Sequence, residues 1–113
     1  PFVVGPAVER KIGVSGMSEL AINATEWRDA EWAHQRGLYA HIYDSKEEMD
    51  KAINELVGKL SKSNPAAMEQ LKEIFWQGTE NWGELLEERA ARSGKLVLSD
   101  FTRNAINAFK SKK

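Results

Sequence analysis

The clearest hydrophobic pattern begins at residue 45 and predicts an amphipathic helix. Ser45 is followed three residues later by Glu48, a capping-box spacing that is typical of a helix start. Behind it, apolar side chains recur every three or four residues, which places them on one helical face. These side chains are Met49, Ala52, Ile53, Leu56, Val57 and Leu60.

Three more amphipathic helices are predicted after this one, each with a polar or glycine boundary. The boundaries are Asn64-Pro65 and Gly78 for the second helix, Thr79 or Asn81 and Ser93-Gly94 for the third, and Ser99 or Asp100 for the start of the fourth. The last helix carries Phe101, Ala105, Ala108 and Phe109 on one face. The chain from residue 45 onward is therefore predicted to be a run of four helices.

The first 44 residues follow a different pattern, with short helices separated by glycine. Gly13 is predicted to end the first helix, and Asp29 to cap a later one that ends at Gly37. The stretch from Leu38 to Tyr43 then alternates aliphatic residues with tyrosine and histidine, which predicts one β-strand. We expect this strand to pair with residues 25–28 or 96–98, or with another copy of the chain.

Together these patterns predict a mainly α fold with one short strand, organised in two parts. Residues 1–44 form the part with short helices and the strand, and residues 45–113 form the helical part.

Composition and charge exclude several classes of protein. The chain has 113 residues, 29% of them charged, and a formal net charge of −1, which argues against a dedicated nucleic-acid or membrane-surface binder. No apolar run approaches the roughly 20 residues that span a bilayer. With no cysteine, the chain has neither disulfides nor a thiolate metal site, and this fits a cytoplasmic location.

Candidate catalytic chemistry is sparse. His34 and His41 are the two histidines, and neither has a carboxylate at a metal-ligand spacing. Neighbouring glutamates such as Glu87 and Glu88 point about 100° apart on a helix, which favours a solvated face over acid–base catalysis. Trp32, Trp76 and the other aromatic residues fit core or interface anchors better than ligand-stacking residues. From these residues we predict no catalytic group, no metal site and no cofactor.

The order of motifs resembles the later part of the enoyl-CoA hydratase/isomerase (crotonase) superfamily. The resemblance rests on GPAVERKIG at residues 5–13, AEWA at 30–33, Gly37-Leu38, SKSNPAAMEQLKEIF at 61–75, and AFKSKK at 108–113. Asp29 stands where the family has a capping serine, and Tyr39 where it has valine. Both replacements keep the local physics, because aspartate caps helices as well as serine and tyrosine favours strands.

The resemblance implies the C-terminal helical segment of a crotonase-like fold, in which a spiral of ββα turns precedes helices used for trimer assembly. The family's oxyanion loop and two acid/base glutamates would lie upstream of the point that matches Pro1, so no catalytic role is assigned to Glu9, Glu19, Glu26 or Glu31. The strand's usual neighbours would lie upstream as well.

The implied function is hydration or isomerisation of acyl-CoA thioesters, with acyl-CoA as the substrate. This segment would supply homo-oligomer contacts and part of the CoA site. By motif match, Phe109 and Lys112 correspond to family positions that reach the adenine and phosphate region of CoA. The alternatives are a core role for Phe109 and a solvated tail for Lys112. For the whole chain, the alternative function is a standalone helical protein-interaction module without catalytic activity.

Overall fold

The computed structural model describes residues 1–111, and the described residues form six helices and no strand. The helices are α1 (Gly5–Ile22), α2 (Ala30–Gln35), α3 (Lys46–Leu60), α4 (Pro65–Phe75), α5 (Trp82–Val97) and α6 (Asp100–Lys110). The predicted mainly α fold is therefore confirmed.

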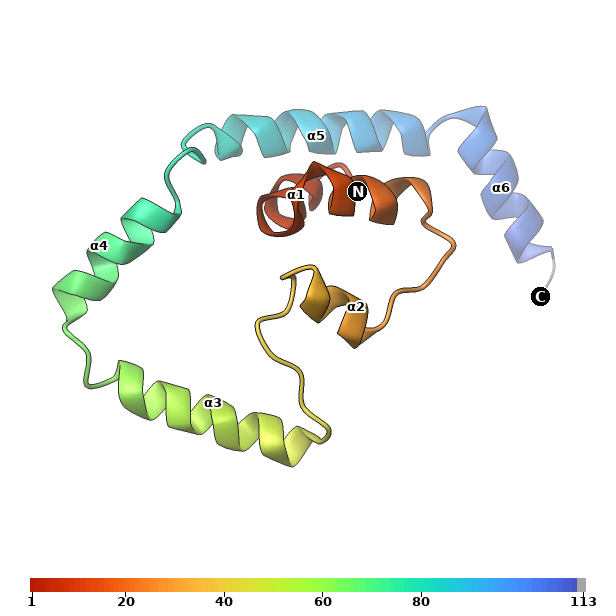
Figure 1. The fold of residues 1–113 in the computed structure, drawn as a ribbon. Coiled ribbons are helices and arrows are strands. Elements are labelled where there is room, and N and C mark those ends of the chain that lie inside the picture. The colour runs from red at the N-terminus through yellow and green to blue at the C-terminus, as the bar shows by residue number, and fades with distance from the viewer. Residues whose placement is uncertain (112–113) are drawn as a thin grey trace.

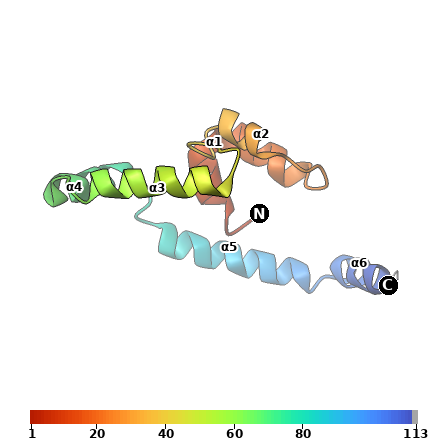
Figure 2. The ribbon, with the colours of Figure 1, turned by 90° about the horizontal axis from the view of Figure 1, so that it is seen from below.

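The helices lie in an open arrangement, because most of them follow one another along an arc. Helices α3 to α6 curve around α1 and α2, as Figure 1 shows. Seen from below, α1 and α2 lie on one side of α3 and α4, while α5 and α6 lie on the other (Figure 2). The radius of gyration is 19.1 Å, whereas a compact domain of this length would have one of about 13 Å.

Four of the described helices start at a polar cap predicted from sequence, whereas α5 follows Asn81, whose side chain makes no capping hydrogen bond. The Asp29 carboxylate accepts a hydrogen bond from the Trp32 N–H at 2.8 Å, and Ser45 Oγ accepts one from the Glu48 N–H at 3.2 Å. Asn64 caps α4, and Ser99 rather than Asp100 caps α6. Each cap satisfies a backbone donor that the first helical turn leaves without a partner.

At two positions where glycine was predicted to end a helix, the helix continues. Gly13 adopts φ 72° inside α1 and introduces a kink there, but the helix resumes and continues to Ile22. The predicted end of α5 at Ser93-Gly94 is wrong, since the helix runs on to Val97. A glycine in a helix interior costs only about 1 kcal/mol, and the residues around Gly94 are good helix formers.

The predicted strand from Leu38 to Tyr43 is also wrong. Gly37, with φ 78°, turns the chain back on α2, so that the N–H groups of Leu38 and Tyr39 both donate to the Ala33 carbonyl oxygen. The proposed partners are not strands either: residues 25–28 form a turn and an irregular segment, and residues 96 and 97 belong to α5. Without a paired neighbour, the segment is a loop.

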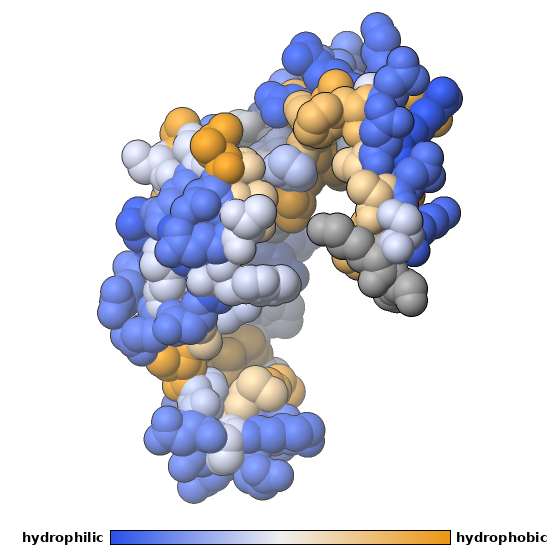
Figure 3. Space-filling view, turned by 90° about the vertical axis from the view of Figure 1, so that its right-hand side faces the viewer, coloured by the Kyte–Doolittle hydropathy of each residue, from blue (hydrophilic) through white to orange (hydrophobic). Residues whose placement is uncertain are grey.

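The apolar faces of the helices remain largely at the surface. Ala33, with 6% of its surface exposed, is the one buried hydrophobic residue among the described residues. Figure 3 shows apolar side chains at the surface in several separate patches, some of them at the edge of a wide hollow. The accessible surface of the chain is 9,594 Å², whereas a compact monomer of this mass exposes about 6,200 Å².

Candidate functional site

Of the two residues predicted to contact CoA, the structure describes Phe109 but not Lys112. Phe109 lies on α6 with 69% of its surface exposed, so it is not a core residue of this chain. It lines a shallow groove of about 500 Å³ together with Thr102, Ala105, Ile106 and Lys110. Lys112 lies outside the described residues, so the structure does not show whether the two come together.

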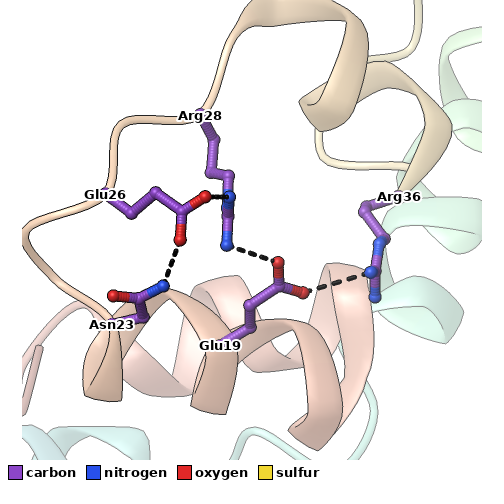
Figure 4. Close-up of polar contacts among 5 residues, drawn as sticks. All are labelled: Glu19, Asn23, Glu26, Arg28 and Arg36. Carbon is purple, nitrogen blue, oxygen red and sulfur yellow. Dashed lines mark hydrogen bonds and ion pairs between the residues drawn. The ribbon is translucent and has the colours of Figure 1, made fainter.

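A polar cluster, which we call the Glu19 clasp, joins α1 to α2 and to the loop between them (Figure 4). Glu19 on α1 accepts from Arg28 at 2.8 Å through one carboxylate oxygen and from Arg36 at 3.1 Å through the other. Arg28 also pairs with Glu26 at 2.6 Å, and the Asn23 side-chain amide donates to the second Glu26 oxygen. A single carboxylate therefore ties together three successive segments of the chain.

The indole of Trp32 lies close to both guanidinium groups of this clasp. The guanidinium carbons of Arg28 and Arg36 are 5.8 Å and 5.3 Å from the ring centre, within the range of cation–π attraction. The hydrogen bond and charge of Arg28, together with the hydrogen bond from Asn23, lower the pKa of the Glu26 carboxyl. The clasp contains two arginines and two glutamates, which makes it a structural fastening with balanced charge.

Sequence reasoning set Glu19 and Glu26 aside and did not identify this clasp. One signal was available: Arg28 and Arg36 stand four residues before and four residues after Trp32. On a helix that spacing brings Trp32 and Arg36 near one another, whereas Arg28 lies in the loop before α2, where the helical period does not apply. It could not show that Glu19, on another helix, would meet both arginines.

Arg10 makes the second connection between distant parts of the chain. Its Nη2 donates to the carbonyl oxygens of Phe75 and Gln77 at 2.7 Å and 2.8 Å, across 65 and 67 residues of sequence. The Phe75 carbonyl ends α4 and the Gln77 carbonyl follows it, just before Gly78, which has φ 82°. Hydrogen bonds from the backbone N–H groups of Glu80 and Gly78 lower the pKa of the nearby Glu80 carboxyl, and the Arg10 charge lowers it further.

Two clefts lie beside Arg10, and both are also lined by Trp82. The larger one, of about 760 Å³, runs between α1 and α5 and carries Glu9 and Arg89. The second, of about 540 Å³, is lined mainly by aromatic and aliphatic side chains from α1, α4, the start of α5 and the loops. In it, Trp76 and Trp82 meet edge to face with their ring centres 5.8 Å apart.

The two histidines do not come together as a site. His34 Nδ1 lies 3.1 Å from the Tyr39 carbonyl oxygen and helps to close the turn after α2, whereas the His41 ring is near Tyr43. Within residues 1–111, no group of three or more potential ligand side chains is arranged to hold a metal ion.

Comparison with protein-family models, with curated proteins and with solved structures finds no match to this chain. None of the helices in the described part is both long enough and apolar enough to cross a bilayer.

Proposed function

We propose that this chain is the C-terminal helical part of an enoyl-CoA hydratase/isomerase family protein, which acts on acyl-CoA thioesters. In this proposal the chain supplies homo-oligomer contacts and part of the CoA site, and the protein is cytoplasmic. The sequence motifs at residues 5–13, 30–38, 61–75 and 108–113 support the family assignment. No described residue is proposed to act in catalysis.

The observation that carries the proposal is the large accessible surface, to which many apolar side chains contribute. The chain exposes about 3,400 Å² more total surface than a compact monomer of its mass. A standard protein–protein interface hides about 800 Å² on each partner. The excess is several times larger than that. It therefore supports the proposal that the rest of a longer protein and neighbouring subunits cover this chain.

Helix α6 supports the ligand part of the proposal. Its apolar face includes Phe101 and Phe109, which are 84% and 69% exposed, and it ends near the basic residues Lys110, Lys112 and Lys113. An exposed aromatic ring that is followed in sequence by lysines suits a base and a phosphate of the kind that CoA carries.

The second candidate is a standalone helical interaction module. The exposed apolar faces of α3 and α4 favour a protein partner, and such a partner fits this candidate as well as the first. The gene sequence upstream of the Pro1 codon separates the two functions. The family proposal expects that sequence to encode ββα repeats with an oxyanion loop and two glutamates. An in-frame stop codon close before Pro1 would contradict it.

A kinetic experiment tests the role of α6 in the full-length protein. Phe109→Ala and Lys112→Ala are expected to raise KM for an acyl-CoA a few-fold with kcat retained, because they remove contacts remote from the reacting thioester. Lys95→Ala on α5 is the matched control and should leave KM unchanged. Equal KM values in all three variants would contradict the CoA contact.

The isolated 113-residue chain is expected to show no turnover of crotonyl-CoA, since it carries none of the family's proton-transfer and oxyanion groups. Turnover above a buffer and contaminant control would show that the proposed division of roles is wrong.

A further inference from the structure

The smaller cleft beside Arg10, which we call the aromatic cleft, has the size and lining of a small-molecule site. Its apolar walls come from Val8, Leu38, Phe75, Trp76 and Trp82. They belong to three segments that are far apart in sequence, so the cleft exists only in the folded chain. Its volume of about 540 Å³ lies within the range of about 300–1,000 Å³ that is common for ligand pockets.

The aromatic rings of this cleft present accessible flat surfaces. Trp76 is 55% exposed and Phe75 is 64% exposed, while Trp82 is half-buried and meets Trp76 edge to face. Perpendicular indoles leave a ring face open to a third group. Flat apolar groups gain about 0.5–1.5 kcal/mol from such aromatic contacts beyond simple burial.

The charged groups that line the aromatic cleft are both cations. Arg10 and Lys11 contribute to its lining, and no lining residue is acidic. The Arg10 hydrogen bonds go to carbonyl oxygens, which carry no full charge, and its Nη1 and Nε are not used in them. Lys11 forms no ion pair with another described residue. Glu80 is near Arg10 but does not line the cleft.

We propose that the aromatic cleft binds a small organic anion with a flat apolar body, of the aryl carboxylate class. The ring system would lie against Trp76 and Trp82, and the carboxylate would meet Lys11 and the unused donors of Arg10. This inference is independent of the proposed acyl-CoA function, because it uses none of the residues assigned to CoA contact.

Paired probes that differ in charge but not in shape test the proposal. Binding of 2-naphthoate and of 2-naphthamide to the purified 113-residue chain is measured by calorimetry and by saturation-transfer NMR. Saturable binding of naphthoate at one site is expected, with an affinity about fivefold higher than that of the amide. Equal affinity for the two probes, or no saturable binding of naphthoate up to millimolar concentration, would overturn the proposal.

Matched variants locate the binding within the chain. Trp76→Ala should weaken both probes about fivefold, and Phe101→Ala, an equivalent aromatic deletion on α6, should weaken neither. Lys11→Met should bring naphthoate down to the affinity of the amide, whereas Lys51→Met on α3 should leave the difference intact. Similar losses from Trp76→Ala and Phe101→Ala would indicate general adsorption to apolar surface and would refute a specific site.

Discussion

The region up to residue 44 and the region after it are both helical, but they are held in different ways. In the first, Glu19 pairs with arginines 9 and 17 residues away, and the pairs join α1, the loop after it and α2. In the second, each ion pair among the described residues lies within a single helix. The pairs are Lys46 with Asp50, Glu88 with Arg92, and Asp100 with Arg103.

This difference shows that local sequence signals can form a helix without packing it against the rest of the chain. The amphipathic helices α3 to α6, three of them with a side-chain cap, have good local signals, yet their apolar faces stay exposed. Most of a helix's stability in a protein comes from packing of its apolar face. We therefore expect the second region to depend on a partner surface, and the first to depend on its own polar clasp.

The largest expected effect comes from the apolar face of α3. Self-association of the chain should be lost in Ile53→Glu plus Leu56→Glu, with a rise in the dissociation constant of about a hundredfold. Both side chains are about half exposed on that face. Sedimentation velocity measures the effect. Lys51→Gln plus Asn54→Glu is the control, since it changes the net charge equally at polar positions of the same helix and should leave association intact. A wild-type chain that stays monomeric at millimolar concentration would refute the dependence on a partner.

Removal of the Glu19 carboxylate should loosen the first region. Glu19→Gln is expected to lower the free energy of opening of α2 by about 1 kcal/mol, because the half-buried Arg28 and the exposed Arg36 lose their charged partner. Hydrogen exchange of the α2 amides measures this opening. Asp50→Asn removes an exposed pair within α3 and should cost about 0.3–0.5 kcal/mol. Equal losses of free energy in Glu19→Gln and Asp50→Asn would contradict the larger role of the Glu19 clasp.

Arg10 connects the two regions, so its removal should affect the segment between α4 and α5. Arg10→Met should make residues 76–81 more susceptible to proteolysis and lower the free energy of local opening by about 1 kcal/mol. Lys11→Met is the adjacent control and should leave the cleavage rate unchanged. Unaltered cleavage in Arg10→Met would show that the two hydrogen bonds do not hold this loop.

A smaller, pH-dependent effect is expected at Glu26. Its pKa is lowered in the folded chain, so its contribution to stability is present above the unfolded pKa and is lost as the pH falls through the folded pKa. NMR titration of the carboxyl carbon should place the midpoint below that of an ordinary glutamate. In Arg28→Gln the midpoint should rise toward the ordinary value. A midpoint insensitive to Arg28 would rule out this cause.

The smallest effect is expected in the loop after Gly37. Ala40→Pro removes one N–H, for which the structure shows no backbone hydrogen-bond partner. The change in the free energy of unfolding should stay within about 0.5 kcal/mol, and association should persist. A strand would lose a ladder hydrogen bond to the same substitution. A loss of several kcal/mol in thermal unfolding would therefore restore the original prediction of a strand.

The sequence by itself determined where most helices begin and which residues form their apolar faces. Asp29, Ser45, Asn64 and Ser99 cap helices through hydrogen bonds to donors two or three residues away. Such interactions depend on neighbours in sequence, so they can be predicted without knowledge of the fold. The CoA-contact assignments rest on motif resemblance and stay predictions.

The tertiary structure alone decided the features that join distant residues. It brought Glu19 to Arg28 and Arg36, placed Arg10 against carbonyls 65 and 67 residues away, and assembled the aromatic cleft from three segments. It also decided that Leu38–Tyr43 is a loop. A strand requires hydrogen bonds from another segment, and local pattern does not say whether that segment is present.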